Sequence, residues 1–210
     1  MTDQKKHWGN VYQTKLPDQV SWFQPHLAKS LKLISESGID KGANIIDVGG
    51  GASTLADDLL AKGFSQVTIL DISVQALNQS KKRLGKKAKS ITCLEADILK
   101  ASLPASSFDL WHDRAVFHFL TKVEDRKAYL EVLKQSLKPN GFVVIATFSL
   151  EGPCKCSGLE VSRYSSETLS KELGKEFKLV SSLNECHKTP FGASQNFVYC
   201  LFQRNSITLM

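Results

Sequence analysis

The chain has 210 residues, a length that favours one domain with a full hydrophobic core. Its apolar fraction of 42% and charged fraction of 23% are typical of soluble globular proteins. The polar start of the chain predicts no signal peptide, and no run of 18 apolar residues predicts a membrane span. We therefore expect a cytoplasmic protein that does not bind a membrane.

Five cysteines are an odd number in a chain whose size does not require disulfides. Reduced thiols are expected. The pair Cys154 and Cys156, with Cys186 and His187 further on, fits no common zinc spacing. No metal site is therefore expected.

Aromatic residues are concentrated ahead of the first predicted strand, at Trp8, Tyr12, Trp22 and Phe23. A predicted helix follows them, because Leu27, Leu31 and Ile34 recur at helical spacing.

The apolar stretch 45–48 predicts a buried strand that ends in three glycines, Gly49, Gly50 and Gly51. Such a turn lets the backbone approach a ligand closely, and a helix is predicted after it. A dinucleotide-binding turn would need a third glycine at the position of Thr54, so pyrophosphate binding is disfavoured.

Asp47 lies near the end of the first predicted strand, and two further acids end the next two predicted strands. Residues 67–70 read as a strand that ends at Asp71, whose carboxylate could accept hydrogen bonds from both ribose hydroxyls. Asp97 ends the third predicted strand, which begins at Ile91. Three acids at three successive strand ends indicate a nucleoside-binding edge.

The net charge is +6, and much of the positive charge lies near the end of the helix predicted over 74–84. Cations at a helix C-terminus favour the helix dipole, and a solvated basic end explains them. No aromatic residue interleaves with these lysines, so nucleic acid stays an open alternative that the charge does not require.

The fourth predicted strand, 108–112, delivers residues 113–120 to the edge where open α/β sheets bind ligands. His112, Asp113, Arg114 and His118 are the candidates for a proton acceptor or a substrate anchor. Asp113 and Arg114 could instead form a structural ion pair, and a lone histidine such as His118 is often a core residue.

The second half of the chain predicts the remaining elements. A helix begins at about Glu124 and places Leu137 on its apolar face; it ends at a turn over 138–141 before a strand over 142–148. Ser165 or Ser166 caps a helix that runs to Leu173. Strands over 177–180 and 197–202 are joined by a hairpin over 185–192, which makes the last strand antiparallel.

Asp47 followed by Gly-x-Gly resembles the first motif of the class I S-adenosylmethionine-dependent methyltransferases. The turn over 138–141 resembles the one before their fifth strand, and Trp8 to Tyr12 resembles the start of small bacterial and mitochondrial-type members. The resemblance implies a three-layer Rossmann-like open sheet of seven strands, mostly parallel with an antiparallel last strand. It divides one domain, 1–210, into a lid segment and helix (1–40), a cofactor-binding core (41–150) and a C-terminal substrate-side part (151–210).

The resemblance also implies S-adenosylmethionine as cofactor and S-adenosylhomocysteine as product. The cofactor-binding residues would be Asp47, Gly49, Gly50, Gly51, Asp71, Ile72, Asp97, Ile98 and Asp113. His118, Asp113 and His112 would be catalytic, and Tyr12, Trp22 and Arg114 would bind the substrate.

The acceptor would be a small molecule or a protein side chain. Residues 113–120 contain no proline, unlike the motif of many nucleic-acid amine methyltransferases, although RNA stays an alternative. A non-catalytic cofactor-binding module is a second alternative, and a nucleotide-dependent oxidoreductase a third that Thr54 disfavours. The sequence indicates no oligomeric state.

Overall fold

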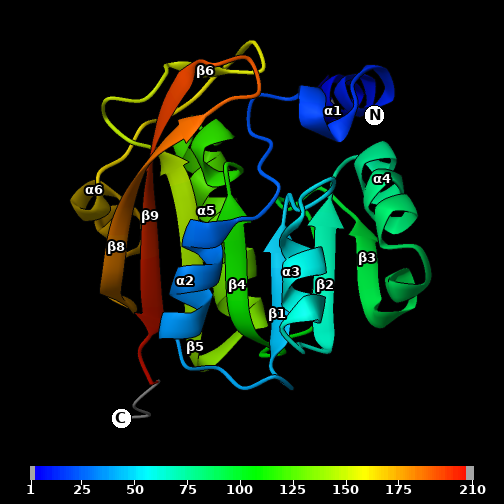
Figure 1. Cartoon of the computed structure of the whole chain (residues 1–210). Helices are drawn as coiled ribbons and strands as arrows, with labels where there is room; N and C mark the ends of the chain where they lie inside the picture. Colours follow the sequence, from blue (N-terminus) through cyan, green and yellow to red (C-terminus); the bar gives the residue numbers. More distant parts are fainter. Residues whose placement is uncertain (1–2, 207–210) are drawn as a thin grey trace.

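A seven-stranded sheet lies at the centre of the computed structural model, which describes residues 3–206. Its order is β3-β2-β1-β4-β5-β9-β8 (Figure 1). The strands are β1 (Asn44–Val48), β2 (Gln66–Asp71), β3 (Ile91–Glu95), β4 (Phe108–Arg114), β5 (Leu137–Phe148), β8 (Phe177–Lys188) and β9 (Ser194–Arg204). The first five pair in parallel, whereas β9 is antiparallel to both β5 and β8. The expected seven-stranded sheet with an antiparallel last strand is confirmed.

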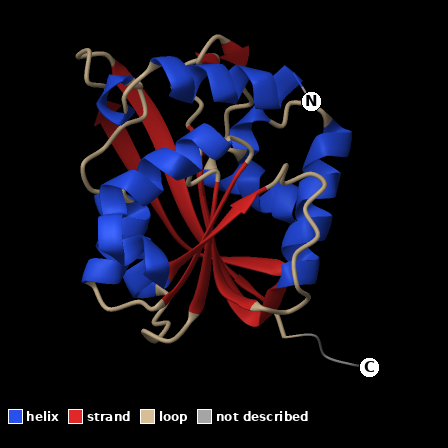
Figure 2. Cartoon of the chain, turned by 90° about the vertical axis from the view of Figure 1, so that its right-hand side faces the viewer, coloured by secondary structure: helices blue, strands red, loops and turns tan. Residues whose placement is uncertain are grey.

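Helices cover both faces of this sheet (Figure 2). They are α1 (Asp3–Thr14), α2 (Ala28–Glu36), α3 (Leu55–Ala61), α4 (Val74–Leu84), α5 (Val123–Ser136) and α6 (Ser166–Leu173), with 3-10 turns η1 (Pro17–Gln19), η2 (Gly85–Ser90) and η3 (Phe117–Phe119). None of the helices within residues 3–206 has both the length and the apolar composition needed to cross a membrane.

Two apolar clusters form because successive side chains of a strand point to opposite faces. Ile45 packs with α2, α3 and Leu77 of α4 on one face, whereas Ile46 packs with α5 and α6 on the other. Both strand residues are fully buried. Parallel strands covered on both faces are mostly apolar, which explains Ile45, Ile46 and Val48 of β1.

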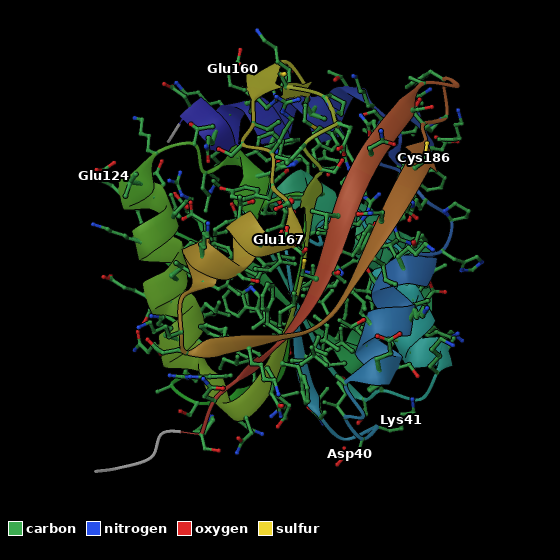
Figure 3. All side chains as sticks on the ribbon, turned by 90° about the vertical axis from the view of Figure 1, so that its left-hand side faces the viewer. Asp40, Lys41, Glu124, Glu160, Glu167 and Cys186 are labelled. Atoms are coloured by element: carbon green, nitrogen blue, oxygen red, sulfur yellow. The ribbon has the colours of Figure 1, made fainter. Side chains whose placement is uncertain are left out.

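The carboxyl ends of the parallel strands define one end of the molecule, and α1 lies over that end beside α4 (Figure 1). Figure 3 shows Glu160 at this end, whereas Asp40 and Lys41, which precede β1, lie at the opposite end. The predicted helix over 74–84 is confirmed, and its N-cap Ser73 accepts a hydrogen bond from the amide of Ala76. Ser165 caps α6 as expected.

The elements differ from expectation in several places. Helix α1 was not predicted, because residues 3–14 are mostly polar and bury only Val11 and Tyr12. Strand β3 stops at Glu95, two residues before Asp97. Leu137 begins β5 and does not continue helix α5.

The turn expected over 138–141 lies within the bounds of β5, where the register with β4 shifts. Asn140 has a φ of 61°, the left-handed conformation that asparagine tolerates. The loop expected after β5 contains a small two-stranded sheet of β6 (Lys155–Cys156) and β7 (Leu159–Glu160). Strand β8 runs on to Lys188, so Glu185 to Lys188 pair with β9 and only the residues between 188 and 194 form the turn.

Candidate functional site

A cavity opens at the carboxyl ends of β1, β2, β3 and β4 and runs beneath α1. Its lining combines acids that follow β2 and β3 with aromatic rings from the N-terminal segment. The lining residues predicted from the sequence are Tyr12, Trp22, Gly49, Asp71, Ile72, Asp97, Ile98 and Arg114. Eight predicted residues from distant parts of the chain therefore meet in one cavity.

Asp71 presents its carboxylate to this cavity from the end of β2. Its Oδ2 accepts the Gly51 amide at 2.9 Å and its Oδ1 accepts the Ser73 amide at 2.8 Å. Each oxygen keeps a second lone pair for a ligand hydroxyl. Burial raises the pKa of Asp71 to about 6, against the lowering effect of these amide hydrogen bonds.

Asp97 lies just beyond β3 and lines the cavity together with its neighbour Ile98. Its Oδ1 accepts the Leu99 amide at 3.1 Å. The apolar side chains of Ile98, Leu70 and Leu99 beside it offer a surface for a planar base. This part of the cavity suits a nucleoside.

The glycine turn supplies backbone rather than side chains. Gly49 has a φ of 68°, and a Cβ there would collide with Val116. A Cβ on Gly50 would collide with the Asp47 carboxylate, and one on Gly51 with that of Asp71. Gly51 itself lines neither this cavity nor the second one described below. Only glycine lets this turn pass so close to both acids.

The rings of Trp8, Tyr12, Trp22 and Phe119 form the aromatic wall of the cavity. Trp8 contacts Phe119 with ring centroids 5.2 Å apart and Trp22 at 5.7 Å, both edge to face. Helix α1 is anchored on α4 by Gln79, whose amide donates to the backbone oxygen of Tyr12 at 2.8 Å. Trp8 and Phe119 were not named as site residues from the sequence. The four-residue spacing of Trp8 and Tyr12 puts both rings on one face of a helix, and this spacing could have identified Trp8.

A second cavity adjoins the first and shares Tyr12, Trp22, Gly49 and Arg114 with it. Asp47, Gly50 and His112 line this second cavity. Asp47 Oδ1 lies 2.6 Å from His112 Nδ1, and His112 Nε2 lies 2.8 Å from the Ser30 hydroxyl. Because a carboxylate only accepts, Nδ1 donates to Asp47. The three side chains join β1, β4 and α2 beneath the glycine turn.

Asp113 is completely buried and lines neither of these two cavities. Its carboxylate accepts the amides of Val116 and Phe117 and the hydroxyl of Tyr129, the last at 2.6 Å. Burial raises its pKa to about 6. These bonds shape the turn after β4. The ion pair with Arg114 considered above does not form, because the two side chains have different partners.

His118 is also completely buried and lies outside both cavities. Its ring packs edge to face against Phe119 and at a tilt against Phe148, with centroids 4.5 and 4.8 Å away. Nε2 has no hydrogen-bond partner within residues 3–206. Burial lowers the pKa of His118 to about 3, so the ring is neutral near pH 7. These contacts describe a packing residue.

Cys156, on β6, is a lining residue that the sequence did not single out as a site residue. Burial raises its pKa to about 12, which keeps the thiol protonated near pH 7. Cys154 is exposed. The part of the chain that the structure describes holds no group of three histidine, cysteine or acidic side chains that could bind a metal.

The residues present fit S-adenosylmethionine. The buried Asp71 carboxylate has free lone pairs inside the cavity, Asp97 and the apolar surface beside it suit an adenosine, and the glycine turn excludes side chains next to both acids. Aromatic rings at the other end suit a sulfonium cation, through attraction between the charge and the ring faces.

The family described as "Methyltransferase domain" matches residues 46–143. The chain is 26% identical to human "EEF1A lysine methyltransferase 2", over 95% of the chain and 85% of the relative. It is also 26% identical to "Malonyl-[acyl-carrier protein] O-methyltransferase 2" of Ilyobacter polytropus, over 94% and 79%. Its fold is similar to that of the N-methyltransferase NodS from Bradyrhizobium japonicum, solved with S-adenosylhomocysteine (TM-score 0.70, 18% identity, 93% of this chain and 97% of that one).

Fold, site and relatives together define an S-adenosylmethionine-dependent methyltransferase of class I. Residues 46–143 match the methyltransferase-domain family, and S-adenosylmethionine is the cofactor that this match and the site support.

Proposed function

We propose that the enzyme transfers the methyl group to a small-molecule or protein side-chain nucleophile that enters beneath the N-terminal aromatic segment. One observation carries this proposal: the aromatic rings of Trp8 and Trp22 line the same cavity as the cofactor acids Asp71 and Asp97. The acceptor then reacts in an enclosed, mostly apolar space, which admits a slender group more readily than a structured nucleic acid.

When bound, the cofactor supplies a methyl group activated by a sulfonium. The protein holds the adenosine through Asp71 and Asp97, and the aromatic wall excludes water from the reacting atoms. Because burial keeps the Cys156 thiol protonated, this side chain does not compete with the acceptor as a nucleophile. Positioning and desolvation of the acceptor supply most of the acceleration.

The positions of the positive charges support this choice over RNA. The basic residues follow α4 away from the cavity: Lys86, Lys87 and Lys89 lie in η2, directly before β3 begins. The amino ends of the parallel strands are at the end of the sheet opposite the cavity (Figure 1). Arg83 is engaged by Asp57 and by two backbone oxygens. A nucleic acid on this cluster would not reach the cofactor.

The activities of the two relatives also support a nucleophile on a larger carrier, since one is a lysine methyltransferase of EEF1A and the other a malonyl-[acyl-carrier protein] O-methyltransferase. A cytoplasmic location is part of the proposal, and the absence of disulfides among the five cysteines supports it.

The test is transfer of labelled methyl groups from S-adenosylmethionine to a cell lysate that is then separated into protein, RNA and small molecules. We expect label in the protein or small-molecule fraction with the wild type, and less label with Asp71→Ala at a cofactor concentration below saturation. Label that ribonuclease releases would assign RNA as the acceptor. Cofactor binding without transfer to any fraction would indicate a non-catalytic module.

A further inference from the structure

Arg114 is the cation of the site. It ends β4 and lines both cavities, between the glycine turn and the aromatic wall. Its Nε donates to the Tyr199 hydroxyl at 2.8 Å, and its Nη1 donates to the Trp22 backbone oxygen at 2.9 Å. The guanidinium also lies over the Phe197 ring, 4.8 Å from its centroid. The side chain is thus held rigidly in place from β9 and the N-terminal segment.

No carboxylate neutralises this guanidinium. Within residues 3–206 Arg114 forms no ion pair, and its adjacent acid, Asp113, is bonded to Tyr129 and to backbone amides. Glu185 approaches only indirectly, through the Tyr199 hydroxyl, which donates to its Oε2 at 2.7 Å. Among the described residues, the Arg114 guanidinium therefore contacts the Tyr199 hydroxyl, the Trp22 backbone carbonyl and the Phe197 ring face, and its positive charge is not neutralised.

The remaining nitrogen, Nη2, is buried and has no hydrogen-bond partner among the described residues. A buried charged donor without a partner costs free energy, and the aromatic contact recovers only part of it. The planar fork of arginine matches a carboxylate or a phosphate. An anionic ligand in the cavity would satisfy both the charge and the free donor.

We propose that the methyl acceptor carries a carboxylate or phosphate group that binds Nη2 of Arg114. The inference rests on the proposed function, since it names a chemical class within the acceptors considered there. Arg114 would then select acidic acceptors, and the aromatic wall would hold the apolar part of the acceptor beside the cofactor.

The methionine carboxylate of the cofactor is the other source of such an anion. The direction of the side chain favours the acceptor, because Arg114 extends from β4 toward Tyr199 and Phe197 of β9, away from Asp71 and Asp97 on the other side of β1. Binding measurements separate the two sources.

The first experiment compares the affinities of S-adenosylhomocysteine and 5′-methylthioadenosine, which lacks the amino-acid tail, for wild type and Arg114→Gln. If Arg114 binds the acceptor, the substitution leaves both dissociation constants within about twofold, below the loss expected for one charge-assisted bond. A loss of about tenfold or more confined to S-adenosylhomocysteine would assign the arginine to the cofactor tail and overturn the proposal.

The second experiment titrates succinate and inorganic phosphate into protein saturated with S-adenosylhomocysteine, with tryptophan fluorescence as the readout because Trp8 and Trp22 line the cavity. We expect saturable binding of at least one anion by the wild type, weakened by about tenfold or more in Arg114→Gln and less in Arg114→Lys. No saturable binding, or equal binding by all three proteins, would overturn the proposal.

Tyr199→Phe is the matched control, because it removes the hydroxyl that orients the Arg114 Nε but leaves the cavity charge. The dissociation constant for the anion should stay within about threefold of the wild-type value, because the loss of one hydrogen bond between side chains has only a modest effect. If Tyr199→Phe weakened binding as much as Arg114→Gln, the effect would come from a disturbed fold. These readouts require no methyl transfer, so they stand even if the lysate experiment detects no acceptor.

Discussion

The Gly51 amide donates to the Asp71 carboxylate at 2.9 Å, and a Cβ on Gly51 would collide with that same carboxylate and with Ala76. The glycine and the acid therefore depend on each other: the amide fixes the carboxylate, and the lack of a side chain leaves room for it. Gly51 and Asp71 are 20 residues apart in the sequence, and this contact explains why the two belong to one site.

Gly51→Ala should displace the Asp71 carboxylate from the cavity and weaken binding of S-adenosylhomocysteine by about tenfold or more, because a charge-assisted hydrogen bond is worth roughly 1.5–3 kcal/mol. Calorimetric titration measures the change. Gly9→Ala is the matched control, since a Cβ there would contact only Gln75, at 3.5 Å. Equal affinity of the Gly51 variant and the wild type would show that the turn can relax without moving Asp71.

Binding of the cofactor should weaken in acid. Burial raises the pKa of Asp71 to about 6, so its carboxylate takes up a proton as the pH falls through that value and loses an acceptor for the ribose hydroxyls. Proton and cofactor then compete, and the affinity for S-adenosylhomocysteine should fall between pH 7 and pH 5. Asp71→Asn should bind more weakly and lack this dependence. A wild-type affinity that stays constant over that range would contradict the assignment.

The stability of the cofactor-free protein should also depend on the protonation of Asp71. The folded pKa of Asp71 lies above the ordinary aspartate pKa of 3.8, so its contribution to stability is fully present below about pH 4 and is lost as the pH rises through about 6. Asp71→Asn removes this contribution. The Tm of Asp71→Asn relative to that of the wild type should therefore be higher at pH 7 than at pH 4, as measured by thermal unfolding.

His118→Ala should lower Tm and leave turnover per folded molecule unchanged, because the ring is buried between Phe119 and Phe148 and lines neither cavity. Removing a large buried side chain costs about 2–5 kcal/mol. His118→Phe keeps the volume and removes the buried Nε2 that lacks a partner among the described residues. It should recover most of the stability.

Reduced turnover of His118→Phe at normal Tm and normal cofactor affinity would instead give the histidine a part in the reaction. The pH dependence offers an independent check. Burial lowers the pKa of His118 to about 3, so the stability that its neutral form contributes is present above about pH 6.5 and is lost as the pH falls toward 3. His118→Phe should unfold at a lower pH than the wild type.

The cofactor side of the site was predictable because it follows local rules. An acid at or just beyond a strand end, a glycine turn and a mostly apolar strand are all visible in a few consecutive residues, and they identified Asp71 and Asp97, which line the cavity. The resemblance to class I methyltransferases implied the seven-stranded sheet, and the predicted hairpin accounted for the antiparallel β9.

The acceptor side depends on contacts between distant segments, which the sequence does not display. Long-range partners decide which of the polar candidates near the end of β4 face the cavity. Asp113 is bonded to Tyr129 and to local amides, and His112 is bonded to Asp47 and Ser30. Of the candidates His112, Asp113, Arg114 and His118, Arg114 is the one that lines the main cavity. Residue type identified the candidates, and only the packing separated them.

The central claim is that Asp71 holds the cofactor in the cavity beneath the aromatic segment. Calorimetric titration of S-adenosylhomocysteine into wild type and Asp71→Ala, with NAD as a second ligand, tests it most directly. We predict that the wild type binds S-adenosylhomocysteine and not NAD, and that the substitution weakens binding by at least about tenfold while the melting curve stays cooperative. Equal affinity of both proteins for S-adenosylhomocysteine, or tight binding of NAD alone, would contradict the claim.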